Sequence, residues 1–205
     1  MDSRLFDRWL LGWVTTMTLM ILTGPVIAGE FSAETIIDRL GQKQQVKMYV
    51  KGRKIRAEMV DAFGQQQILI SQPGPDKTFM LYPKTKGYMS FPATAALSPL
   101  EQAEATTRRL IGEEKVEGYL CDKYEIAFPN TYRGKLMVWV ARKLDYPIRM
   151  IQVDGPPGDS LNRKLIHIQE RRIDDAMFAV PADYKRVKKP VQGFCGAGFC
   201  TVSLY

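Results

Sequence analysis

Few residues of this 205-residue chain are of the types that do nucleophilic or acid–base chemistry near neutral pH. There are three cysteines, Cys121, Cys195 and Cys200, and one histidine, His167. A catalytic thiolate needs a neighbouring base that a third group orients, and the sequence suggests no such trio. The neighbours of His167 in Leu165–Ile168 alternate as they do in a strand, so we interpret this histidine as structural.

Other catalytic and metal-binding patterns are also missing from the sequence. There is no G-x-S-x-G elbow, no P-loop and no histidine-rich metal set. Cys195 and Cys200 are too far apart for a Cys-x-x-Cys redox pair, and a four-ligand zinc site would need a carboxylate to join them. Carboxylates are plentiful enough for the catalytic pair of a glycosidase, but no stretch suggests the sugar-stacking platform that such an enzyme requires. We therefore predict a protein that is not an enzyme and has no cofactor or metal.

The N-terminal segment has the pattern of a secretory signal. Arg4 and Arg8 precede a mostly apolar run from Trp9 to Leu22, and Val26-Ile27-Ala28 matches the small-x-small site of a signal peptidase. We predict that residues 1–28 are a signal peptide that is cleaved after Ala28. The alternative is an uncut membrane anchor, since the segment is about as long as the roughly 20 residues that span a bilayer.

Export would place the cysteines in an oxidising compartment, where disulfides persist. Cys195 and Cys200 have two glycines between them, so their pairing is sterically easy, and we predict this disulfide. Cys121 is then expected to be a buried small residue. A bond from Cys121 to either C-terminal cysteine is the alternative, and it would dock the tail against the sheet.

Positive charge gathers in the C-terminal third of the chain. The net charge is +7, and 13 basic residues stand against 7 acidic ones between Arg133 and Lys189. The densest basic segment contains Lys185, Arg186, Lys188 and Lys189. For an exported chain we expect an anionic membrane surface or an acidic protein as its partner, and no nucleic acid. A merely solvated tail is the equal alternative.

The body of the chain alternates with a period of two residues. Before Gly52, apolar residues alternate with Lys47, Tyr49 and Lys51. After Gly52 a second apolar series alternates with charged residues. This pattern predicts an antiparallel hairpin with one face exposed to solvent. Further strands are expected at 30–39, 66–71, 77–82, 88–91, 118–128, 134–141, 147–153 and 164–173. Strands at this spacing predict a mainly β protein with one large, curled antiparallel sheet.

One segment follows a helical pattern instead. Ser98-Pro99-Leu100-Glu101 has the residues of a capping box, and the expected helix runs to about Leu110 and stops near Gly112. Its apolar stripe is narrow, so the helix either covers the sheet as a lid or simply packs on it. We expect one domain over residues 29–190 and a glycine- and cysteine-rich tail over residues 191–205.

Five segments in order carry a resemblance to a known family. They are Lys47–Val60, Met80–Phe91, Gly118–Tyr124, Tyr146–Ile151 and Phe178–Val187. This series resembles the uncharacterised periplasmic proteins related to the LolA and LolB lipoprotein carriers, over Phe31 to about Val187. The resemblance implies a curved antiparallel sheet forming an open half-barrel, with one or more helices across its concave face. It also implies a periplasmic protein that binds a lipid or another hydrophobe, and it transfers no functional residue.

The alternating strands supply a hypothetical lining for an acyl-chain-like ligand. Flexible methionines would suit a ligand of variable shape. The lining consists of Val46, Met48, Val50, Ile55, Ala57, Met59, Phe79, Leu81, Met137 and Trp139. Two alternatives remain: these residues form an ordinary filled core, or the protein is an envelope adaptor or sensor that binds a protein through its sheet face or its basic segment.

Overall fold

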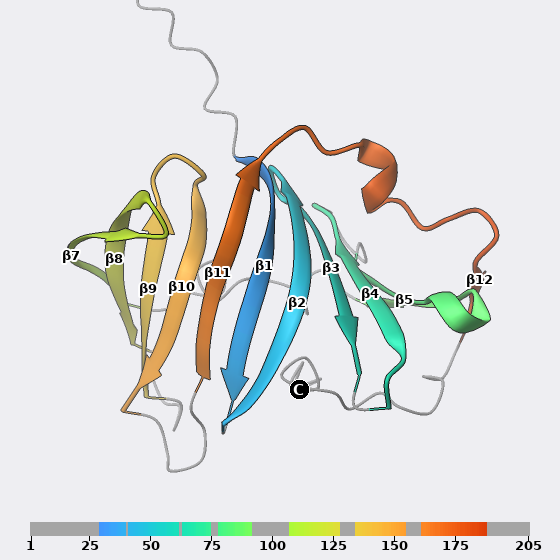
Figure 1. Cartoon of the computed structure of the whole chain (residues 1–205), viewed down its shortest axis with the longest axis horizontal. Helices are drawn as coiled ribbons and strands as arrows, with labels where there is room; N and C mark the ends of the chain where they lie inside the picture. The colour runs from blue at the N-terminus through green and yellow to red at the C-terminus, as the bar shows by residue number, and fades with distance from the viewer. Residues whose placement is uncertain are drawn as a thin grey trace, which may run out of the picture.

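Twelve strands form one curved, open sheet in the computed structural model (Figure 1). The structure describes residues 29–39, 41–61, 63–74, 78–91, 107–127, 134–154 and 161–187. The strands are β1 (Glu30–Arg39), β2 (Gln42–Lys51), β3 (Lys54–Val60), β4 (Gln66–Ser71), β5 (Thr78–Tyr82), β6 (Gly87–Phe91), β7 (Thr107–Val116), β8 (Tyr119–Ala127), β9 (Lys135–Ala141), β10 (Tyr146–Val153), β11 (Leu161–Glu170) and β12 (Lys185–Arg186). Two short 3₁₀ helices are η1 (Pro83–Thr85) and η4 (Asp175–Phe178).

The sheet consists of two antiparallel meanders that meet in its middle. Strands β1 to β6 pair in chain order, and β7 to β11 do the same on the other side. The two meanders join where β1 pairs antiparallel with β11. The short β12 then pairs parallel with β6, so β12 and β7 lie at opposite edges of the sheet (Figure 1).

The predicted hairpin and the predicted strands are confirmed in type and place. Lys51 pairs with Lys54 across a two-residue turn, where Gly52 adopts a φ of 57° that a side chain would strain. The strand predicted at 30–39 matches β1 at both ends, and the others differ by only a few residues at their termini. The mainly β class and the curved open sheet are therefore as expected.

The predicted helix is wrong at its C-terminal end. Residues 107–110 begin β7 and pair with β8, and Gly112, which was expected to stop a helix, lies at a bulge within the strand. Pairing with β8 overrides the local helical pattern, because ladder hydrogen bonds and cross-strand contacts outweigh propensity. Residues 98–106 of the expected helix lie outside the described residues. Within the described ranges, no helix is long and apolar enough to cross a membrane.

The β1–β6 meander has two faces, which we name after neighbouring residues of β2. The Met48 face carries Val46, Met48 and Val50 and belongs to the largest buried cluster. The Tyr49 face carries Tyr49, Ile68, Ile70 and Leu81, which form a second cluster. Because successive strand residues point to opposite sides, the two clusters lie on opposite faces of the same strands.

The Tyr49 face is covered by the segment after β11, contrary to the prediction of a wet face. Ile173 and Phe178 from this segment belong to the same buried cluster as Tyr49. Arg56 donates from Nη1 to the carbonyl oxygen of Met177 at 2.9 Å. Asp174 caps η4 by accepting from the backbone N–H of Ala176. Tyr49 is only 8% exposed as a result, although it alternates with two lysines in the sequence.

Candidate functional site

Most of the predicted ligand-lining residues come together, but two do not. Val46, Met48, Val50, Ile55, Ala57 and Met59 share the Met48 face and belong to one cluster with Met137 and Trp139. Phe79 and Leu81 pack in the other cluster, on the Tyr49 face. Phe79 pairs with Ile70 and not with Leu69, which fixes its side of the sheet. One hollow cannot therefore be lined by all ten side chains.

A row of apolar side chains crosses the Met48 face at right angles to the strands. Met48 pairs with Ala57, Ala57 with Leu69, Leu69 with Met80, and Met80 with Met89. We call these five residues the methionine strip. Four strand spacings of about 4.8 Å give it a length of roughly 19 Å. Met48, Ala57 and Met80 are buried in this structure, and Leu69 and Met89 are half-buried.

A cation lies at the Met48 end of the methionine strip. The Arg163 guanidinium donates from Nη2 to Met48 Sδ at 3.3 Å and to Tyr146 Oη at 3.4 Å. Thr35 Oγ1 donates to the same sulfur at 2.7 Å. The Nε of Arg163 is buried and has no hydrogen-bond partner. Among the described residues no carboxylate pairs with Arg163, so its charge meets only weak acceptors.

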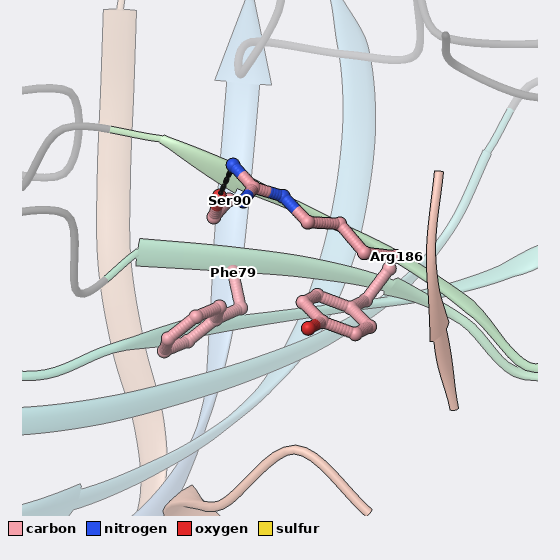
Figure 2. A pocket seen from close by; sticks show the side chains of 4 residues that line it. Phe79, Ser90 and Arg186 are labelled. Carbon is pink, nitrogen blue, oxygen red and sulfur yellow. Dashed lines mark hydrogen bonds between the residues drawn. The ribbon is translucent and has the colours of Figure 1, made fainter. Parts of the chain in front are cut away.

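A shallow cavity opens on the other face, near the edge formed by β6 and β12. It has a volume of about 370 Å³ and is lined by Phe79, Tyr88, Ser90 and Arg186. Figure 2 shows the Arg186 side chain reaching over to Ser90, where Nη2 donates to the serine hydroxyl at 2.8 Å. Phe79 and Tyr88 meet edge to face, with ring centroids 6.2 Å apart. The cavity thus combines an aromatic wall with one cation.

The predicted basic segment contributes to this edge only in part. Lys185 and Arg186 are exposed in β12, which is held to the sheet because the backbone N–H of Val187 donates to the carbonyl oxygen of Tyr88 at 2.8 Å. A second cavity of about 600 Å³ involves Arg186 and Val187 with Met89. Lys188 and Lys189 lie outside the described residues. Arg186 is therefore a pocket residue as well as a surface charge.

Trp139 is fixed by a polar cluster and does not line an open hollow. Its Nε1 donates to Glu114 Oε2 at 2.7 Å, and Lys123 Nζ lies 3.2 Å from the same oxygen. The Lys123 ammonium and the Arg149 guanidinium each lie 4.7 Å from the indole centroid, within range of a cation–π contact. The hydrogen bond from Trp139, with help from Lys123, holds the pKa of Glu114 below its usual value.

The reactive side chains named in the sequence analysis do not form one site in the structure. Cys121 is fully buried with a free thiol, as expected, and burial raises the pKa of that thiol. His167 is exposed, with Nδ1 3.1 Å from Glu34 Oε2. The pKa of Glu34 is lowered, first by the hydrogen bond with His167 and then by that from Gln45. No group of three or more potential metal ligands occurs in the described part of the chain, and Cys195 and Cys200 lie outside it.

The sequence matches a known family over the first nine strands of the sheet. Residues 28–145 match the family described as a domain of unknown function, DUF4412. The chain belongs to this family. Strands β1 to β9 lie within the matched range, and so does the methionine strip, whereas Arg163 and Arg186 follow it. No curated protein sequence matches the chain.

Several solved structures are similar to the DUF4412 chain. An uncharacterised conserved protein from Thermus thermophilus is 12% identical, with a TM-score of 0.57, and the match covers 80% of this chain and 93% of that one. A chain of the Pseudomonas aeruginosa MucA/MucB complex is 15% identical, with a TM-score of 0.51, and the match covers 80% of this chain and 60% of that one. A LolA superfamily protein from Nitrosomonas europaea is 12% identical, with coverages of 74% and 90% and a TM-score of 0.43. At these identities the first two similarities show a shared fold.

Proposed function

We propose that this DUF4412 protein is an exported, non-enzymatic binding protein for an amphiphile with an acyl-like chain and an anionic head. The observation that carries the proposal is the methionine strip with Arg163 at one end of it. An apolar row of roughly 19 Å is complementary to such a molecule when it ends at a cation that has no carboxylate partner among the described residues. The chain lies along the strip, and the head accepts hydrogen bonds from the guanidinium.

The charge on Arg163 supports an anionic ligand and not a neutral one. Within the described ranges this half-buried cation meets a thioether and a phenol, and both are weak acceptors compared with a carboxylate, so its charge is poorly compensated. A carboxylate or phosphate head could reach the unpartnered Nε as well as one Nη, in the fork geometry typical of arginine. Ligand binding would thereby remove an unfavourable feature of the empty protein.

The expected affinity is modest. Burying about ten methylenes contributes roughly 8 kcal/mol, at about 0.8 kcal/mol each. Association costs on the order of 4–15 kcal/mol, and a buried strip must also be opened before a ligand can enter. Reversible binding at micromolar or weaker affinity suits a carrier and not a store.

The setting of this function is the periplasm. The proposal rests on the signal-like pattern of residues 1–28, with cleavage after Ala28 and a domain over residues 29–190. A passive carrier there needs no cofactor, since it changes no covalent bond of its cargo.

The test of the chain site is a displacement titration with a fluorescent fatty acid on delipidated protein. The wild type should bind saturably, and Met80→Glu should abolish binding because it places a carboxylate in the apolar strip. Val60→Glu is the matched control, since it adds the same charge at an exposed position on β3. Ala57→Leu narrows the strip without adding charge, and it should weaken binding in a variant that stays folded. No saturable binding by the wild type up to the ligand's solubility limit would overturn the proposal.

The test of the head site compares a fatty acid with its methyl ester. The wild type should prefer the acid, and Arg163→Gln should remove most of that preference while ester binding changes little. Arg186→Gln, which removes the cation of the cavity on the other face, should leave the preference intact. If Arg186→Gln removes the preference and Arg163→Gln does not, the ligand occupies the Phe79–Arg186 cavity and the proposed location is wrong.

A second candidate function is that of an envelope adaptor that binds a protein. Two observations favour it: the fold is shared with a chain of the MucA/MucB complex, and one edge of the sheet bears exposed apolar side chains. The basic segment gives a direct test of this alternative. Lys185→Glu with Arg186→Glu should weaken binding of an acidic peptide while leaving fatty-acid binding unchanged.

A further inference from the structure

The edge strand β7 has an unusual distribution of charge and apolar surface. Its sequence is Thr-Arg-Arg-Leu-Ile-Gly-Glu-Glu-Lys-Val, from Thr107 to Val116. Two cations, Arg108 and Arg109, precede two apolar residues, and two anions, Glu113 and Glu114, follow them. Read backwards, the segment from Arg108 to Glu114 begins with two anions and ends with two cations, and Lys115 adds one cation beside the anions. Such a strand is complementary to an antiparallel copy of itself.

The centre of β7 is exposed, and no described strand pairs with its outer side. β7 ends the strand order and pairs only with β8 among the described strands. Leu110 is 56% exposed and Ile111 38% exposed, although apolar residues in strands are usually covered. Edge strands that avoid pairing with other chains usually have a charge or a proline at such a position. In β7 the charges instead flank an apolar centre.

The bulge in β7 decides which self-pairing is possible. Leu110 pairs with Tyr124 and Gly112 with Lys123, so Ile111 is the additional residue. Without a bulge, residues an odd number of positions apart lie on opposite faces and could not stand opposite each other in a symmetric pair. The additional residue shifts the alternation by one. Arg108, opposite Ile126, and Glu113, opposite Asp122, therefore lie on the same face of the sheet.

We propose that two copies of this chain associate by antiparallel pairing of their β7 strands about a two-fold axis between Leu110 and Ile111. In this register Arg108 of one copy stands opposite Glu113 of the second copy, and Leu110 opposite Ile111. Arg109 stands opposite Gly112 and diagonal to Glu114, which shares its face. The two-fold axis repeats each contact, so opposite charges meet on both sides of the apolar centre.

The free groups of β7 fit this arrangement. Arg108 is exposed and makes no ion pair with the described residues, and its guanidinium lies 4.3 Å from the ring centroid of Tyr124. Gly112 has a φ of 154° and no atom within 4 Å of the position of a Cβ, so a second backbone can approach it. Glu113 already pairs with Arg142, and Arg109 with Glu125 at 3.0 Å. Glu113 and Arg109 would therefore share their charge between the partner in their own chain and the second copy.

The association should be weak, because one strand pair buries little surface. Interfaces below about 1,200 Å² in total are typical of transient complexes. We therefore expect a monomer–dimer equilibrium that depends on protein concentration. The joined sheet would continue through both copies and would cover two edges that otherwise invite aggregation.

Sedimentation equilibrium of the full-length exported protein, over a hundredfold range of concentration, tests the proposal. The wild type should dimerise as the concentration rises. Arg108→Glu with Arg109→Glu, and separately Glu113→Arg with Glu114→Arg, should each remain monomeric, because each sets like charges opposite each other. An equimolar mixture of these two double variants should form a heterodimer, because the mixture restores every opposite-charge pair.

Each result bears on the proposal. The control is Lys185→Glu with Arg186→Glu, which makes the same charge change at the opposite edge and should leave the equilibrium unchanged. Circular dichroism establishes that the variants are folded. A monomeric wild type at the highest concentration, dimers of either β7 double variant, or a mixture that stays monomeric would each overturn the β7 pairing. Loss of the dimer in the β12 control would place the interface at the other edge.

Discussion

Replacing Phe178 by alanine should be among the most damaging single changes in this protein. Phe178 is 1% exposed and comes from the last turn of η4. It packs against Ile70 and Leu81, both fully buried on the Tyr49 face. The paired strands beneath it cannot sink to fill the space that a phenyl ring would leave.

The expected loss follows from this burial. Phenylalanine-to-alanine changes at fully buried sites lower the free energy of unfolding by about 3–5 kcal/mol, as lost transfer energy plus a cavity term. A total stability of roughly 5–15 kcal/mol would leave the variant folded but with a much lower midpoint in urea. The slope of the unfolding free energy with urea should stay the same if the segment from Ile173 to Val187 remains docked.

Phe63→Ala is the matched control for urea denaturation followed by tryptophan fluorescence. Phe63 is 70% exposed, so its removal should change the free energy of unfolding by less than about 0.5 kcal/mol. Equal losses in the two variants, or a loss below about 1 kcal/mol for Phe178→Ala, would refute the view that η4 anchors the segment. A smaller urea slope for Phe178→Ala would instead show that the segment has already left the sheet.

Four further predictions concern titration, processing and the thiols. The pKa of Asp175 is held at about 2 by hydrogen bonds from two lysines, so its contribution is present above about pH 3.8 and is lost as the pH falls through about 2. The melting temperature of Asp175→Asn should accordingly fall less than that of the wild type between pH 5 and pH 2. Cys121 should react with a thiol reagent only in denaturant, because burial both blocks it and raises the pKa of its thiol. Non-reducing peptide mapping should find Cys195 bonded to Cys200, and a link from either to Cys121 would contradict this. The intact mass of protein from the periplasm should correspond to a chain that begins at Gly29, and a mass that retains residues 1–28 would favour the anchor.

The strands were predictable from sequence because alternation and turn residues agree along most of the chain. Both point to the same hairpin around Gly52, and β2 and β3 pair across that turn. Which face of the sheet the apolar residues of each strand occupy was harder to predict. Alternation says that Phe79 and Leu81 share a side, but it does not say which side, because the register of pairing with β4 decides that. Two of the predicted lining residues were thus assigned to the wrong face.

Tertiary contacts explain the other differences. The helical spacing that reaches Leu110 is compatible with a helix only in isolation, and pairing with β8 decides the matter. The covering of the Tyr49 face was missed because no buried element was predicted between residues 174 and 184. Asp174 followed by the apolar Met177 and Phe178 was a usable signal for a capped, buried turn. Arg163 carried no sequence signal, since its isolation arises only when the register brings it to Met48.

The junction of the two meanders has a consequence for the order in which the chain can fold. Each hairpin closes a turn of a few residues, whereas the pairing of Thr35 with Leu165 closes a loop of about 130 residues. By the logarithmic rule this closure costs about 3 kcal/mol more than that of a four-residue turn. Long-range pairing of this kind is slow. During synthesis, which begins at the N-terminus, β1 to β6 would therefore form early. The edge of β1 would stay unpaired until residues 161–170 have been made. During that interval β1 is a free template for other chains, and a general chaperone of extended strands would find its substrate there.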